Sequence, residues 1–105
     1  MSITDVIREA VNEHEILFLL TAYIEAVRHC DPLHHLPEIA RRLPLNGVED
    51  VRVRTERLRA DLESPDALDD KKRLVLAEAL DIFAVARHRL ETLHEDDQVA
   101  LVAAA

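Results

Sequence analysis

Residues 75–93 of the chain read VLAEALDIFAVARHRLETL, and this stretch decides the fold. Its apolar residues recur every three or four positions, the spacing that puts side chains on one broad face of an α-helix. Extended in both directions, the pattern predicts a helix from about Pro65 or Ala67 to about His94. The apolar positions of this helix are Leu68, Val75, Leu76, Ala79, Leu80, Ile82, Phe83, Ala86, Leu90 and Leu93.

The rest of the chain has a similar composition. One glycine, Gly47, and four prolines occur in 105 residues, and aromatic residues make up 3%. Helix formers therefore dominate, whereas the aromatic residues that favour strands are scarce. The length suits one domain, and no shift in composition marks a linker. We predict a single all-α domain over residues 1–105.

A second long helix is predicted at the start of the chain. Ser2 and Asp5 resemble a capping box that opens it, and Pro32 restricts Asp31 and closes it. The apolar spacing between them, which includes His14, continues for about 27 residues, or about 40 Å. Within this helix, residues 16–20 are apolar all round, so we expect them to be covered on more than one side.

Two shorter helices are predicted between the long ones. Prolines bound a helix from Glu38 to Leu43, and Asn46 with Glu49 resembles a capping box that opens the next helix. Residues 98–105 form a small-residue tail, which we expect to fray. The sequence therefore predicts an elongated antiparallel helical bundle of three long or medium helices and a short proline-bounded one. The apolar seam of the later short helix is Val48, Val51, Thr55, Leu58 and Leu62.

The charge and apolar runs narrow the class of partner. The formal net charge is −8, so the chain is repelled by nucleic acids and anionic membranes, and another protein chain becomes the expected partner. The runs of large apolar residues, such as residues 16–20, are far below the about 20 residues of a membrane span. A single cysteine, Cys30, and the lack of a signal-like start predict a cytoplasmic protein.

One apolar group on the first helix is the candidate interface, and we refer to it as the apolar belt. Large aliphatic and aromatic side chains at the centre of a patch carry most of the binding energy in protein complexes. The alternative is that the belt forms the core of the bundle itself. The belt consists of Ile16, Leu17, Phe18, Leu19, Leu20 and Tyr23.

A metal-binding or small-molecule-binding bundle is the alternative from another class. Glu91 and His94 form one Glu-x-x-His pair, to which Glu13 and His14 of the first helix could be added. Di-iron bundles carry this motif on two helices, and the chain has no second copy. A separate group of His29, Cys30, His34 and His35 lacks zinc-finger spacing. We therefore predict no cofactor.

Residues 36–53 superficially resemble a helix-turn-helix, and residues 52–59 carry a stripe of four arginines. Such side chains can contact phosphates. However, Pro44 stands where the motif usually has glycine, and Asp50 occupies an apolar position. An ion-paired, solvated helix face is the alternative. The four arginines are Arg52, Arg54, Arg57 and Arg59.

No catalytic motif is recognisable, because the chain has no glycine-rich phosphate loop and its serines resemble helix caps. We therefore predict a small, acidic, non-catalytic protein. It acts through protein–protein interaction, either by self-association, for example as a homodimer, or as an accessory or regulatory subunit of a larger assembly.

Overall fold

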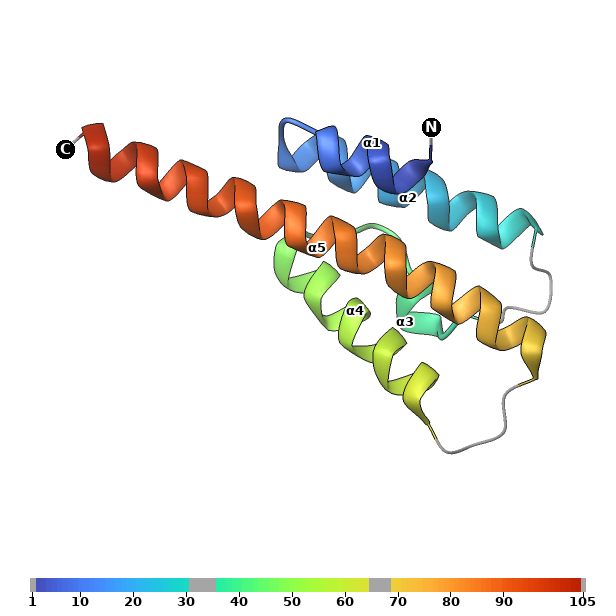
Figure 1. The fold of residues 1–105 in the computed structure, drawn as a ribbon. Coiled ribbons are helices and arrows are strands. Elements are labelled where there is room, and N and C mark those ends of the chain that lie inside the picture. Colours follow the sequence, from blue (N-terminus) through green and yellow to red (C-terminus); the bar gives the residue numbers. More distant parts are fainter. Residues whose placement is uncertain (1, 31–35, 65–68, 105) are drawn as a thin grey trace.

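The computed structural model describes residues 2–30, 36–64 and 69–104, and within these ranges the chain forms helices and no strand (Figure 1). The predicted all-α class is confirmed. The molecule measures 53 × 27 × 25 Å along its principal axes, as expected for an elongated bundle. The helices of the described residues are α1 (Ile3–Glu9), α2 (Glu13–Cys30), α3 (Glu38–Arg41), α4 (Val48–Glu63) and α5 (Asp70–Ala104).

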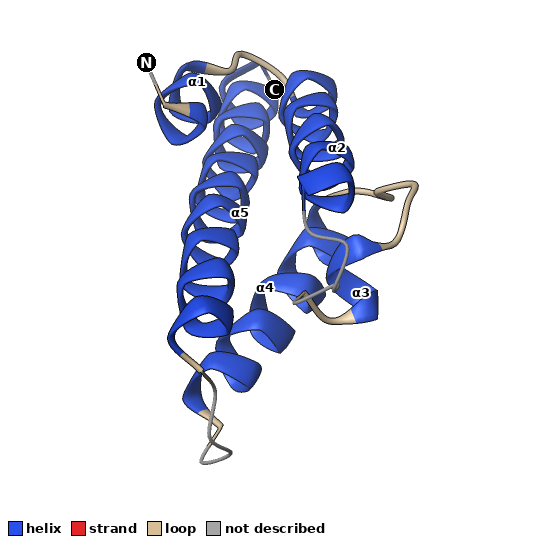
Figure 2. Ribbon diagram, turned by 90° about the vertical axis from the view of Figure 1, so that its right-hand side faces the viewer, coloured by secondary structure: helices blue, strands red, loops and turns tan. Residues whose placement is uncertain are grey.

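Helix α5 is the central element of the bundle. Its 35 residues extend about 52 Å at 1.5 Å per residue, and therefore account for the length of the molecule. α1, α2 and α4 all pack against α5, while α3 packs against α2 and α4 (Figures 1 and 2). The remainder of α5, toward its C-terminal end, projects past the other helices (Figure 1).

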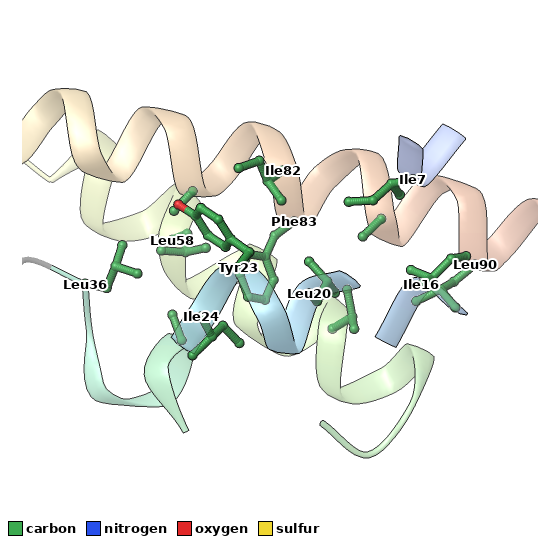
Figure 3. Packing of buried hydrophobic residues seen from close by; sticks show 14 of the residues in the cluster. Ile7, Ile16, Leu20, Tyr23, Ile24, Leu36, Leu58, Ile82, Phe83 and Leu90 are labelled. Carbon is green, nitrogen blue, oxygen red and sulfur yellow. The ribbon is translucent and has the colours of Figure 1, made fainter. Parts of the chain in front are cut away.

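The core lies where α2 and α4 meet α5. Phe83 of α5 is fully buried, and it lies among Tyr23 and Leu20 of α2 and Leu58 of α4 (Figure 3). Phe83 and Leu58 come from positions that the apolar spacing of their helices predicted, whereas Leu20 and Tyr23 belong to the apolar group of the first helix that the sequence left open between core and interface. The buried hydrophobic residues are Ile7, Ala10, Ile16, Leu20, Tyr23, Ile24, Leu36, Ala40, Val51, Leu58, Leu76, Ala79, Ile82, Phe83, Ala86 and Leu90.

The predicted first helix is wrong in one respect, because it consists of two helices. Ser2 and Asp5 do form the predicted capping box at the start of α1. Asn12 then begins a new helix: its Oδ1 accepts from the Glu15 backbone N–H at 2.8 Å, and Glu15 Oε2 accepts from the Val11 N–H at 3.2 Å. This reciprocal capping satisfies backbone donors that a continuous helix would satisfy internally. α1 consequently runs antiparallel to α2 and packs mainly against α5 (Figures 1 and 2).

The start of α4 also differs from the prediction. Gly47, with φ of +130°, is the N-cap residue, and no side chain caps the helix there. The Asn46 backbone N–H donates to Asp50 Oδ2 at 2.9 Å, so the carboxylate in contact with Asn46 belongs to Asp50 and not to Glu49. The predicted seam is confirmed, since Val51, Thr55 and Leu58 are buried; Val48 and Leu62, at the ends of the seam, are half-buried.

The bounds of α3 and α5 are shifted from those predicted. α3 ends at Arg41 and not at Leu43, with Pro37 as its N-cap residue. α5 begins at Asp70, where Asp69 Oδ1 accepts from the Lys72 N–H at 2.8 Å. It continues to Ala104, so the backbone of the predicted tail is helical. No glycine or proline follows His94 to stop it. The part of the predicted start at 65–68 lies outside the described residues.

A membrane-crossing helix would need more length and more apolar character than any described helix of this protein has.

Candidate interaction surfaces

The helical period of α2 divides the apolar belt between core and surface. Ile16 and Leu20 are fully buried, and Tyr23 is nearly so. Leu17 and Leu19 are half-buried at the edges, whereas Phe18 is 65% exposed. Most of the belt therefore belongs to the core of the bundle. Phe18 is left on the surface, so the expectation that all of residues 16–20 are covered is wrong at this position.

The side of α2 that points away from α5 is the main candidate surface. We call the exposed group of Phe18, Ala22, Glu25 and Ala26 the outer face of α2. No described helix covers this side of α2 (Figure 2). The exposed phenylalanine offers a large apolar side chain, and the small side chains of the alanines beside it leave room for another helix. Both features suit contact with a helix of a partner.

Tyr23 shows how different the inner side of α2 is. Burial, and to a lesser extent the negative charge of Glu78 on α5, raise the pKa of its hydroxyl well above the usual range. The phenol therefore stays protonated at neutral pH. Its ring packs with Phe83 in the core (Figure 3), so the residue belongs to the packing of the bundle.

The four residues of the metal hypothesis are only partly brought together. Glu13 and His94 line a common cleft of about 180 Å³ with Val48, Leu90 and Leu93. His14 is exposed on α2, contrary to its place in the predicted apolar pattern. Glu91 Oε1 accepts from Arg87 Nε at 3.0 Å.

Among the described residues, no group of three His, Cys, Asp or Glu side chains is arranged to hold a metal ion. Of the separate histidine and cysteine group, His34 and His35 lie outside the described residues, so the structure does not describe that group as a whole.

The arginines of α4 are paired with carboxylates. Arg52 binds Glu49, Arg57 Nε lies 3.0 Å from Asp61 Oδ1, and Arg59 lies 3.9 Å from Glu56. Hydrogen bonding by Arg52 lowers the pKa of Glu49. The same kind of bond from Arg87 of α5 lowers the pKa of Glu56. This arrangement is that of an ion-paired helix face.

Arg54 does not belong to this face, although the sequence placed it there. Its side chain is 2% exposed, and its Nε donates to Asp50 Oδ1 at 2.9 Å. It also donates to the backbone carbonyls of Arg42 and Pro44. Burial works against ionisation of Asp50, but the bonds from Arg54 and Asn46 outweigh it and lower the pKa of that carboxyl. Arg54 of α4 therefore holds the segment of Arg42 and Pro44 against α4 through hydrogen bonds.

A third surface feature was not foreseen. A hollow of about 420 Å³ is lined by Arg28 of α2, Glu38 and Arg41 of α3, and Arg42 and Leu43 after α3. Three guanidinium groups thus share one hollow with a single carboxylate. Arg28 is far from the other two arginines in sequence, so no local pattern could have joined them.

Comparisons with protein-family models, with curated proteins and with solved structures found no match for this chain.

Proposed function

We propose that this protein acts as a non-catalytic protein-binding module, and that the outer face of α2 binds a second copy of the chain. The observation that carries the proposal is the 65% exposure of Phe18 on the outer face of α2. No described helix covers this side of α2 (Figure 2). Covering a phenylalanine side chain is worth about 1.5–3 kcal/mol relative to leaving it in water.

The neighbours of Phe18 support a helix as the occupant. Ala22 and Ala26 follow at one-turn intervals and are exposed. Side chains as small as alanine allow two helix backbones to approach closely, while half-buried Leu17 and Leu19 widen the apolar contact. An aromatic anchor surrounded by smaller contacts is the usual composition of an energetic centre in an interface.

Charge supports a second copy in antiparallel orientation. The first turn of α2 carries Glu15, and its last turn carries Arg28 and His29. Glu13, in the same first turn, instead lines the cleft with Val48 and Leu90. When two copies of α2 lie antiparallel, the acidic turn of each lies beside the basic turn of the other. The opposite helix dipoles are then adjacent as well. A parallel pair would instead place like charges together.

We place this protein in the cytoplasm and propose no chemical reaction for it. A single cysteine in 105 residues suits a reducing compartment such as the cytoplasm. The described arginines of α4 are engaged in ion pairs, which favours a protein partner over nucleic acid. No chemical step or cofactor is assigned to the protein.

Sedimentation equilibrium tests the self-association. We expect a concentration-dependent rise toward twice the chain mass of 11.9 kDa, and we expect Phe18→Asp to abolish it. Leu74→Asp is the matched control, because Leu74 is 71% exposed but lies on α5. A wild-type chain that stays monomeric, or a Phe18→Asp variant that still dimerises, would overturn the proposal.

Cysteine cross-linking in a Cys30→Ser background tests the orientation. Ala22 lies next to the midpoint of α2 (Glu13–Cys30), so in an aligned antiparallel pair it meets its own copy. Ala26 is one turn away and does not. We expect Ala22→Cys to form an intermolecular disulfide and Ala26→Cys to form little. Cross-linking of both would indicate parallel helices, and a dimer in which neither cross-links would exclude α2 as its interface.

A further inference from the structure

We propose that the hollow between α2 and α3 binds a phosphate group, carried by a small phosphorylated molecule. The hollow is lined by Arg28, Glu38, Arg41, Arg42 and Leu43. Its formal charge is +2, in a chain whose net charge is −8. This inference concerns a different class of ligand from the self-association. Arg28 takes part in both proposals, since it lies in the last turn of α2, whereas Arg41 and Arg42 belong to the hollow alone.

The guanidinium groups keep donors available for a ligand. Arg41 uses its Nε to donate to the Leu36 carbonyl at 3.0 Å, which fixes the side chain and leaves its terminal nitrogens for other acceptors. Arg42 pairs with Glu38 at 3.4 Å, and both side chains are more than half exposed. Such a pair contributes little free energy and exchanges readily. Within the described residues, Arg28 makes no hydrogen bond or ion pair.

The backbone beside the hollow is held in place. Buried Arg54 donates to the carbonyls of Arg42 and Pro44, and its other partner is Asp50 of the same helix. The wall that presents Arg42 and Leu43 is therefore tied to α4. Fixing the backbone that carries Arg42 before the ligand arrives lowers part of the entropy cost of binding.

The number of arginines and the size of the hollow indicate the ligand. A carboxylate is satisfied by one guanidinium, whereas a phosphate group presents more charge and more acceptor oxygens, which several arginines can share. A volume of about 420 Å³ is in the range of small-molecule sites and exceeds that of a bare anion. Phosphate attached to a small organic group fits both properties, and the net charge disfavours a polyanion.

Titration followed by amide and arginine side-chain NMR tests the inference. The probes are inorganic phosphate and pyrophosphate, with acetate at the same ionic strength as the control anion. We expect saturable shifts confined to residues 38–43 and to Arg28, with pyrophosphate binding more tightly than phosphate. Tighter binding of a phosphate monoester such as glycerol phosphate would identify the organic part, and equal binding would assign the site to the free ion.

Variants localise the site. Arg41→Gln should weaken phosphate binding at least about tenfold, since hydrogen bonds to charged groups are each worth about 1.5–3 kcal/mol. Arg28→Gln provides an independent variant in case the first one disturbs α3. Arg57→Gln, on α4, is the matched control and should bind as the wild type does. The inference is overturned if phosphate and pyrophosphate give no saturable shifts, if acetate reproduces them, or if both variants bind as the wild type does.

Discussion

α2 and α4 both pack against α5, yet their exposed sides are chemically opposite. On α4, Arg57 pairs with Asp61 and Arg52 with Glu49. On α2, the corresponding side presents Phe18 and Ala22. Exposed ion pairs lose little by staying in water, whereas an exposed aromatic side chain gains when it is covered. These energies favour α4 as a solvated face and support the proposal that α2 binds a partner.

The buried sides of the two helices differ as well. α2 turns aliphatic residues such as Ile16 and Leu20 inward, whereas α4 buries a charged residue, Arg54, together with Val51 and Leu58. The bonds of Arg54 to Asp50 and to two backbone carbonyls satisfy its charge and donors. α4 therefore depends on a polar network where α2 depends on close packing.

The largest effect is expected from removing the buried cation of α4. Arg54→Ala leaves the carbonyls of Arg42 and Pro44 without this donor and leaves Asp50 with only the Asn46 N–H, which should cost about 3–5 kcal/mol of the free energy of unfolding. Urea denaturation followed by far-UV circular dichroism measures it. The control is Arg57→Ala, which removes an exposed pair and should cost at most about 1 kcal/mol. Equal losses in the two variants would contradict the distinction between the inner and outer sides of α4.

The next effect separates the two sides of α2. Leu20→Ala removes a fully buried side chain and should cost about 2–5 kcal/mol. Phe18→Ala, two residues away, should change the stability of the monomer by about 0.5 kcal/mol or less, since the side chain is mostly exposed. Both are measured by denaturation at concentrations where the chain is monomeric. A loss at Phe18 as large as that at Leu20 would show that the ring is buried within the monomer.

A smaller effect compares how the two helices begin. Asn12 caps α2 through its side chain, so Asn12→Ala should cost about 1 kcal/mol. Asn46 contacts Asp50 through its backbone N–H, so Asn46→Ala should be close to neutral. Thermal denaturation of the pair of variants checks this difference. The reverse order would restore the capping box predicted from Asn46 and Glu49.

The smallest effect is expected on the stability of the fold at acidic pH. The pKa of Asp50 is lowered in the folded state, so its ionisation stabilises the fold above the unfolded-state pKa of about 4. This contribution is lost as the pH falls below about 4, through the folded-state pKa. Asp50→Asn removes the titrating group, and its stability should therefore depend less on pH in this range than that of the wild type. The same slope in both proteins would mean that Asp50 is not the group responsible.

The local features of the fold were predictable where they depend on neighbouring residues. The capping box of Ser2 and Asp5, and the seam of Val51, Thr55 and Leu58, are both present as predicted. The break at Asn12 was missed, although Asn12 and Glu15 have the spacing of a capping pair. The continuing apolar spacing on both sides of the break was read as one helix. An Asn followed three residues later by Glu could have signalled the break.

The candidate surfaces were harder to predict from the sequence than the helices. The apolar belt was recognised, but its residues could not be assigned to core or surface until the direction of α5 from α2 was known. Arg54 was grouped with its neighbours Arg52 and Arg57 because all three look alike in sequence. The burial of Arg54 depends on how the segment before α4 packs against that helix, since the Arg42 and Pro44 carbonyls of this segment accept hydrogen bonds from Arg54.

The sequence alone therefore determined that this protein is an elongated all-α bundle. Helix propensity, apolar period and caps act within a few residues of one another, and they can be read along the chain. Only the tertiary structure decided that Phe18 is left outside while Leu20 is buried, and that Arg28, Arg41 and Arg42 share one hollow. These arrangements depend on how whole helices pack, and packing brings together residues that are far apart in the sequence.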